Sequence, residues 1–291
     1  MKTIRIGNQT SCWAASPMEP FDYAVANRFD AFEWFPDKKP GVGWDETDLS
    51  ETQRRTIRET ARVRDIRLSV HARWQANPLQ PDSYPLLETD LRLAQDLGAT
   101  LLNIHLHHES GLKAYASALL PLIQKTAETG VSLSIENTPL HAPELINELF
   151  ARLGDQNSAP TGHVGFCLDL GHANLCSATL NDYLAFVDRL HQQVPIIHLH
   201  LHENWGDADT HLPLFTGPAG TNDSGIRKFV KRMKARKFSG CIILEQWPRP
   251  PSLLNHAKDT MVALFADAEA PGAAAKARPA GLSLAPVRLG R

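Results

Sequence analysis

The chain has 291 residues, which is too long for a small disulfide-stabilised scaffold and fits one large domain more economically than two. Its formal net charge of −2 and pI near 6.7 give no overall attraction to nucleic acid. No apolar run approaches the ~20 residues of a membrane span, and the opening residues MKTIRIGNQT lack an apolar core of signal-peptide length. We therefore expect a cytoplasmic protein.

Apolar, strand-like runs alternate with helix-like stretches along the chain. The runs lie near residues 3–7, 29–35, 66–71, 100–106, 131–136, 164–170, 196–202 and 241–246. Between them, stretches such as SETQRRTIRETARVRD and LETDLRLAQDLG repeat their apolar residues every three or four positions, as helices do. Eight strands interleaved with helices predict an α/β fold, a single-domain (β/α)8 TIM barrel over residues 1–265.

Two compositional features complete the organisation. From about Ala266 the chain turns to Ala, Pro, Gly and Arg, so residues 266–291 are predicted to form a disordered tail. The four cysteines, of which Cys167 and Cys241 fall inside predicted strands, are interpreted as free thiols rather than a disulfide framework or a cysteine zinc site.

Acidic and histidine residues stand at or just past the ends of five apolar runs. The runs read LLNIH, VSLSIEN, VGFCLDLGH, IIHLHLHE and CIILEQ, and the residues are His105, Glu136, Asp169, His200 and Glu245. The C-terminal ends of barrel strands meet at one mouth, where active sites of this fold lie. The five side chains are therefore predicted to converge.

Four more residues extend this set to nine. His71 ends the third run in LSVHARW, His172 follows Asp169 in DLGH, and Asp209 and His211 lie in the loop after the seventh run. Burying one charge near the barrel axis costs several kcal/mol unless it is paired or bound to metal. Nine such residues at one mouth therefore favour a metal site.

Several positions keep a second interpretation. His198 and His202 share a strand face with His200, but we interpret them as histidines of the deeper core or as supports for a ligand. Either His107 or His108 would replace His105 if the strand ended later. Glu33 is a pocket acid or an ion-pair partner, and any single strand-end acid can also be a helix cap.

The chain resembles the xylose-isomerase-like TIM barrel superfamily, also called AP endonuclease family 2. The resemblance runs from about residue 3 to 265 and is strongest in SIENTP, CLDLGHANL, HLHLHENWGDADTHLPL and ILEQW. Members of that superfamily include sugar isomerases and epimerases, inosose-processing enzymes and the DNA-repair enzyme endonuclease IV. The resemblance implies the barrel and an enzymatic role at its mouth.

The two branches of the superfamily imply different metal centres. In the isomerase branch, the resemblance implies one divalent metal held by Glu136, Asp169, His200 and Glu245. The endonuclease branch adds His71, His105, His172, Asp209 and His211 to form a three-zinc cluster, with Glu136 bridging two ions. An oxygen-rich set with one imidazole suits Mn²⁺, Mg²⁺ or Co²⁺, whereas added imidazoles favour Zn²⁺.

The expected activity is that of a metal-dependent isomerase or epimerase acting on a small sugar, polyol or sugar phosphate. Glu136 and Glu245 would move the proton beside the substrate carbonyl, and the ion would stabilise the charge that develops. The alternative is a zinc-dependent phosphodiesterase of the endonuclease IV type, which needs a basic surface for DNA. A non-catalytic barrel that binds a metabolite is the third interpretation.

The expected partner is a carbohydrate-like small molecule, not a membrane, and nucleic acid is disfavoured. The basic run IRKFVKRMKARK is interpreted as a solvated helix face. Trp13, Trp34, Trp74, Trp205 and Trp247 follow predicted strands, so we expect them on the active-site face, with Trp13, Trp74, Trp247 and His172 contacting substrate. The oligomeric state, a homo-oligomer included, stays open.

Two departures from the family pattern concern the loop near Asp209. The turn after HLPL runs Phe-Thr-Gly-Pro-Ala-Gly instead of leading directly into Gly-x-Gly, and position 203 is Glu where many relatives have Asp. Both bear on substrate identity more than on metal binding.

Overall fold

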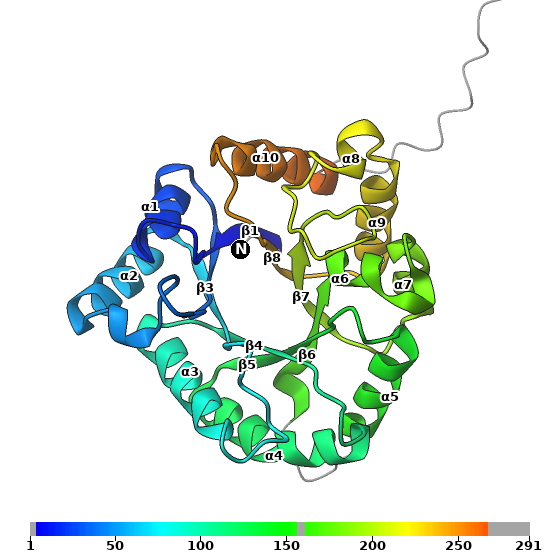
Figure 1. Ribbon diagram of the computed structural model, residues 1–291, viewed down its shortest axis with the longest axis horizontal. Coiled ribbons are helices and arrows are strands. Elements are labelled where there is room, and N and C mark those ends of the chain that lie inside the picture. Colours follow the sequence, from blue (N-terminus) through cyan, green and yellow to red (C-terminus); the bar gives the residue numbers. More distant parts are fainter. Residues whose placement is uncertain (1–3, 156–160, 267–291) are drawn as a thin grey trace, which may run out of the picture.

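The structure, a computed structural model, describes residues 4–155 and 161–266. Eight parallel strands close into a barrel in chain order, with helices outside the ring (Figure 1). The strands are β1 Ile4–Gln9, β2 Ala31–Trp34, β3 Arg67–His71, β4 Leu101–His105, β5 Ser132–Glu136, β6 Val164–Asp169, β7 Ile196–Leu201 and β8 Gly240–Leu244. The predicted TIM barrel is confirmed.

The helices follow the strands in the order that the sequence predicts. They are α1 Met18–Ala26, α2 Glu51–Arg64, α3 Tyr84–Leu97, α4 Leu112–Thr129, α5 Pro143–Gly154, α6 Leu170–Leu175, α7 Tyr183–Arg189, α8 Pro218–Thr221, α9 Ser224–Ala235 and α10 Ser252–Ala266. Short 3-10 turns occupy Glu46–Asp48, Thr161–His163 and Ser177–Thr179.

Local sequence signals set the helix ends. Ser50 caps α2 through a reciprocal pair of hydrogen bonds with Gln53, which satisfies backbone groups that the first turn leaves free. Helix α3 starts earlier than the apolar repeat suggests because Pro85, at its first turn, is compatible with helix entry. The same helix ends at Gly98, whose φ of 70° suits a residue without a Cβ.

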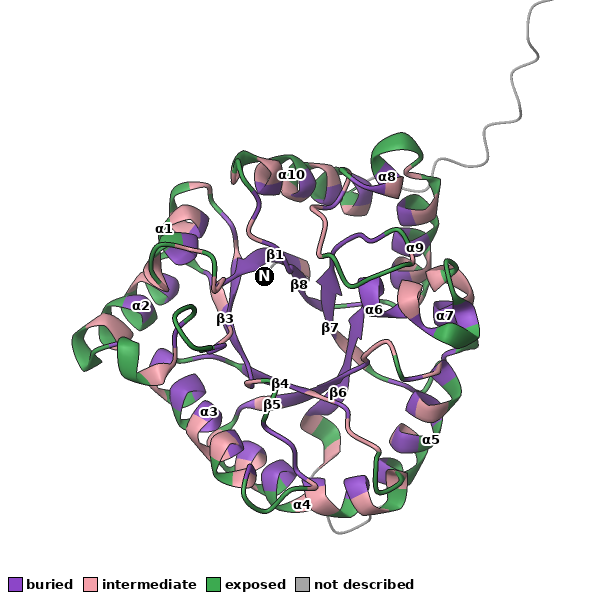
Figure 2. Ribbon diagram, in the orientation of Figure 1, coloured by how far each residue is buried: buried purple, intermediate pink, exposed green. Residues whose placement is uncertain are grey.

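Side-chain alternation divides each strand between two environments. In β7, Leu199 and Leu201 are buried in the apolar layer beneath the helices, while His198 and His200 are buried among polar groups of the barrel interior. Figure 2 shows the ring of strands coloured almost entirely as buried, whereas the helices expose their outer faces. The barrel interior therefore holds charged groups that need partners.

The remaining predictions about organisation have mixed outcomes. All four cysteines are free, as expected. Of the predicted tail, residues 267–291 lie outside the described part, and Ala266 is the last residue of α10, so the boundary at residue 265 stays a prediction. None of the helices described combines the length and apolar composition that a membrane crossing requires.

Candidate metal centre

Four of the predicted strand-end residues form a tight group at the barrel mouth. Glu136 ends β5, Asp169 ends β6, His200 lies near the end of β7, and Glu245 directly follows β8. One ligand atom from each lies within 4.8 Å of all the others, and all four residues are buried. We call Glu136, Asp169, His200 and Glu245 the primary cluster.

The primary cluster has a donor set suited to a divalent cation. His200 Nδ1 lies 3.3 Å from Glu136 Oε2, 3.3 Å from Glu245 Oε2 and 4.0 Å from Asp169 Oδ2. These contacts lack hydrogen-bond geometry: Nδ1 of His200, Oδ2 of Asp169 and Oε2 of Glu245 are buried and form no hydrogen bond within the described residues. Three carboxylates and one imidazole with unused lone pairs fit a divalent ion.

The electrostatics keep two carboxylates of this group, those of Glu136 and Asp169, ionised. Burial opposes ionisation of Glu136, but the imidazoles of His200 and His105 outweigh burial and hold the pKa of Glu136 well below its usual range. Burial also opposes ionisation of Asp169, yet His172 and His202 lower the pKa of that carboxyl. Ionised oxygens are the form that metal binding requires.

Glu33 lies beside the primary cluster, inside the barrel. Its carboxylate contacts two histidines of β7, with Oε1 2.7 Å from His200 Nε2 and Oε2 2.9 Å from His198 Nε2. Ser69 donates a hydrogen bond of 2.8 Å to Oε2. These contacts support the interpretation of Glu33 as an ion-pair partner. His198 is buried in the barrel interior, as expected of a core histidine.

His71 and His105 also lie beside Glu136. His71 Nδ1 donates to the Ala72 carbonyl at 2.6 Å, which leaves Nε2 facing Glu136 Oε2 at 3.1 Å. His105 Nε2 is farther, 3.7 Å from Glu136 Oε1, and burial lowers the pKa of His105 to about 3. His71, Glu136 and His200 also have ligand atoms within 4.8 Å of one another.

The two alternatives to His105 point elsewhere. His108 Nδ1 lies 3.0 Å from His141 Nε2, and His107 Nδ1 lies 3.9 Å from Glu109 Oε1. Because β4 ends at His105, as the first interpretation required, His105 is the histidine of this loop nearest Glu136.

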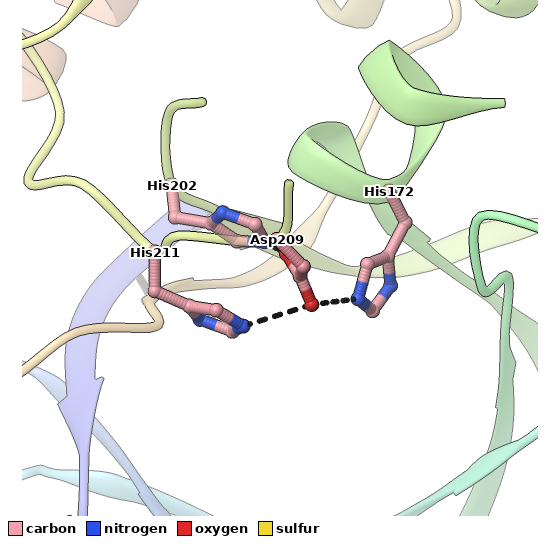
Figure 3. Close-up of side chains that lie close together, drawn as sticks. All are labelled: His172, His202, Asp209 and His211. Atoms are coloured by element: carbon pink, nitrogen blue, oxygen red, sulfur yellow. Dashed lines mark hydrogen bonds and ion pairs between the residues drawn. The ribbon is translucent and has the colours of Figure 1, made fainter. Parts of the chain in front are cut away.

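A second group lies further out in the mouth. His172, His202, Asp209 and His211 each offer one ligand atom within 4.8 Å of the others, and we call them the outer cluster (Figure 3). Asp209 Oδ2 lies between two imidazoles, 3.1 Å from His172 Nε2 and 3.2 Å from His211 Nε2. The rings of His202 and His211 stack 4.0 Å apart. Three imidazoles and one carboxylate are a donor set that favours Zn²⁺.

Local backbone structure positions the outer cluster. Asp169 caps α6 by accepting a 2.6 Å hydrogen bond from the backbone N–H of His172. An antiparallel bridge between Glu203 and Leu212 closes the loop that carries Asp209 and His211. His211 has a φ of 46°, which is uncommon for a residue with a side chain and marks a constrained loop.

The departures from the family pattern act on this loop. The Glu203 carboxylate accepts hydrogen bonds from the backbone N–H groups of Phe215 and Ala219, the second at 2.9 Å. The two departures are therefore structurally linked, because the Glu203 side chain holds the Phe-Thr-Gly-Pro-Ala-Gly turn against the end of β7 through these hydrogen bonds.

Sequence reasoning missed His202 as a candidate ligand. Its Nε2 lies 3.2 Å from Asp169 Oδ2, and neither ring nitrogen forms a hydrogen bond among the residues described. A Cβ at position 171 would come within 2.0 Å of the His202 ring, so the glycine of DLGH makes room for it. That glycine, together with the shared face of His200 and His202, was the available signal.

A pocket of about 480 Å³ opens beside both clusters. Trp13, Trp74 and Trp247 line it, together with His172. Their contact with substrate stays a prediction, and the placement of one other tryptophan was wrong. Trp34 is buried against Phe21, Phe32 and Trp44, because alternation in AFEW turns it outward when Glu33 points inward. Trp205 is 59% exposed and does not line the pocket.

Among curated proteins, this chain is similar to two from Methanocaldococcus jannaschii. The uncharacterized protein MJ1311 is 26% identical over 136 residues, covering 44% of this chain and 41% of the relative. The uncharacterized protein MJ1614 is 27% identical over 135 residues, covering 45% and 47%. The chain thus matches less than half the length of these curated relatives.

Solved structures share the fold at low identity. A D-tagatose 3-epimerase-like protein is 20% identical with a TM-score of 0.69, covering 90% of this chain and 97% of the other. D-psicose 3-epimerase in the presence of D-fructose is 12% identical with a TM-score of 0.65, covering 90% and 100%. The TTHB071 protein of Thermus thermophilus, soaked with ZnCl2, is 21% identical with a TM-score of 0.59, covering 88% and 98%.

Residues 21–264 match the family described as xylose isomerase-like TIM barrel. With the closed eight-stranded barrel, this match establishes that the chain belongs to the xylose isomerase-like TIM barrel family.

Proposed function

We propose that this protein is a divalent-metal-dependent isomerase or epimerase acting on a small sugar, polyol or sugar phosphate. The observation that carries the proposal is the primary cluster, whose four ligand atoms lie within 4.8 Å of one another at the barrel mouth. Their buried, unused lone pairs match a divalent cation rather than a second protein side chain.

Each residue of the primary cluster has a role in this chemistry. Glu136, Asp169, His200 and Glu245 would hold Mn²⁺, Mg²⁺, Co²⁺ or Zn²⁺. A divalent ion there would withdraw electron density from the substrate carbonyl and stabilise the charge that develops when the neighbouring carbon loses its proton.

Glu136 and Glu245 are the proposed acid/base pair. One carboxylate takes the proton from the carbon beside the carbonyl, and the other, as an acid, delivers a proton to the opposite face or to the adjacent carbon. The first outcome is epimerisation and the second is isomerisation. The low pKa of Glu136 keeps it ionised at neutral pH, as a base must be. His172, whose Nδ1 lies 3.4 Å from Glu136 Oε1, is proposed to contact the substrate.

The pocket walls agree with a carbohydrate. Trp13 and Trp74 are 69% and 53% exposed at the pocket, where flat rings can cover the C–H face of a sugar. Two proteins of similar fold are named as epimerases, or epimerase-like proteins, of the free sugars D-tagatose and D-psicose. Their names support the same substrate class for this protein.

Proton exchange in deuterium oxide tests the proposal. The Mn²⁺-loaded protein, incubated with D-fructose, D-tagatose and D-psicose, should incorporate deuterium at the carbon beside the carbonyl of at least one sugar. Glu136→Gln and Glu245→Gln should each reduce the rate by two orders of magnitude or more, roughly the contribution of one acid or base. Glu148→Gln, which alters only an exposed ion pair on α5, is the matched control. A protein that retains no divalent metal would refute the proposal.

A zinc phosphodiesterase of the endonuclease IV type is the second candidate. The outer cluster, with His71 and His105 beside Glu136, supplies the additional ligands that such an enzyme would need. Metal counting separates the two: one Mn²⁺ or Mg²⁺ per chain supports the isomerase, and two or three Zn²⁺ support hydrolysis. Nicking of abasic-site DNA by the purified protein would refute the isomerase.

A further inference from the structure

Apart from its histidines, the pocket beside the two clusters offers almost no positive charge to a substrate. Lys39 is the one lysine or arginine among the described residues that line it. Its Nζ lies 2.9 Å from Asp37 Oδ2, so its charge is already neutralised within the pocket wall. Enzymes that bind phosphate esters present basic side chains or a run of backbone N–H groups to the phosphate.

Histidines bind metal as neutral imidazoles, so the remaining charges of the metal-loaded pocket are negative. The primary cluster contributes three carboxylates, so one divalent ion leaves one negative charge, and Asp209 of the outer cluster adds a second. A second divalent ion in the outer cluster would do no more than restore neutrality. With ions in both clusters, the pocket therefore presents no net positive charge to a phosphate group, which carries close to two negative charges.

The pocket wall also contains two neutral amide side chains, those of Gln9 and Gln246. Gln9 ends β1, and Gln246 follows Glu245 beyond the end of β8, a strand that pairs with β1 through Asn8 and Leu244. Both amides are more than nine-tenths buried in the pocket wall. Oε1 of Gln9 and both amide atoms of Gln246 form no hydrogen bond within residues 4–155 and 161–266.

Unpaired buried amides carry a cost that a bound hydroxyl group can remove. An amide offers both a donor and an acceptor, which matches a sugar hydroxyl, itself donor and acceptor. Trp247 lines the same pocket, and its ring packs edge-on against Tyr23 with the ring centroids 5.6 Å apart. This side of the pocket therefore pairs an apolar ring with neutral polar groups, as carbohydrate sites do.

We infer that the substrate is an uncharged polyhydroxylated carbonyl compound, a free ketose or oxidised polyol and not a sugar phosphate, and that Gln9 and Gln246 bind its hydroxyl groups. The inference rests on the proposed function, since Gln9 and Gln246 line the same pocket as the proposed ligand Glu245. It makes Gln9 and Gln246 determinants of specificity, while Glu136 and Glu245 carry the chemistry.

Paired sugars test the inference by calorimetric titration of the full chain loaded with Mn²⁺. The probes are D-fructose, D-tagatose and D-psicose, each with its 6-phosphate. At least one free sugar should bind about tenfold or more tightly than its phosphate. Gln9→Met and Gln246→Met keep the side-chain length but lose the amide. Each should lower the affinity for that free sugar about threefold to tenfold. Gln192→Met, an exposed position between α7 and β7, is the matched control.

A charge variant tests the electrostatic part separately. Asp37→Asn should free the charge of Lys39 from its ion pair. The affinity for the sugar phosphate should then rise relative to the affinity for the free sugar. Metal content and melting temperature, measured for every variant, identify any that fails to fold.

Each outcome decides one of the two proposals. Equal or tighter binding of the phosphates, or no binding of any free sugar to protein that holds Mn²⁺, overturns the inference and leaves the metal site standing. Unchanged affinity in both glutamine variants overturns their assigned role. Failure to retain any divalent ion overturns the proposed function itself, and the inference with it.

Discussion

Glu33 tests whether the primary cluster is organised from inside the barrel. Its Oε1 lies 2.7 Å from His200 Nε2, while Ser69 and His198 fix the other carboxylate oxygen at 2.8 Å and 2.9 Å. The contact between Oε1 and Nε2 lacks hydrogen-bond geometry, but a carboxylate this close favours a proton on Nε2. That proton leaves the lone pair of His200 on Nδ1, the atom that faces Glu136 and Glu245. We predict that Glu33 sets both the tautomer and the orientation of His200.

The expected loss follows from what such supports contribute elsewhere. Removing the partner of a metal-bound histidine costs about 10- to 100-fold in metal affinity, or roughly 1.4 to 2.7 kcal/mol. Glu33→Gln keeps the side-chain shape and one hydrogen-bond acceptor but loses the negative charge. Its loss of metal affinity should therefore be near tenfold, the lower end of this range. Glu33→Ala also strands two buried imidazoles, so it should lower the free energy of unfolding by about 3 kcal/mol or more.

Competition with a fluorescent chelator for Mn²⁺ or Zn²⁺ measures the affinity. Long-range ¹⁵N correlation spectra of histidine-labelled protein report which nitrogen of His200 carries the proton, with His200→Gln identifying the signal. Glu144→Gln, which removes an exposed ion pair with Arg189, is the control. Wild-type affinity in both Glu33 variants, or an unchanged His200 tautomer in Glu33→Ala, would refute the reasoning.

Four further predictions follow from the same geometry. Asp169→Ala should lose the metal of the primary cluster, measured by elemental analysis; full occupancy would contradict the ligand set. His202→Gln should weaken only a second equivalent of Zn²⁺, whereas equal loss of both equivalents would argue against a separate outer cluster. In His211, burial opposes the charged imidazole, but nearby carboxylates outweigh burial and raise the pKa to about 10. Because this pKa is raised, the stabilisation of the folded protein by protonated His211 is complete below about pH 6.5 and is lost as pH rises towards 10. Urea unfolding of the metal-free protein should show this decline in the free energy of unfolding, and His211→Gln should make the decline smaller. Trp34→Ala should cost about 3 to 5 kcal/mol in the same assay without changing metal affinity, because Trp34 packs in the core away from the pocket.

The sequence was sufficient for the barrel and for the residues at its mouth. Strand and helix periods alternate eight times, and parallel strands in a closed barrel bring their C-terminal ends to one rim. Convergence of Glu136, Asp169, His200 and Glu245 therefore follows from connectivity, without knowledge of any side-chain conformation. Alternation also determines that Glu33 and Trp34 face opposite ways, although strand-end position alone misplaced Trp34.

Only the tertiary structure decided which atoms meet. Glu33 on β2 and His200 on β7 are remote in sequence, and their contact depends on the diameter of the barrel and on two side-chain conformations. His202 joins Asp209 and His211 because Gly171 leaves space for its ring and because the bridge between Glu203 and Leu212 folds the loop back. Such contacts depend on distances of a few ångströms between segments far apart along the chain, whereas a one-dimensional pattern records only the order and the face of each residue.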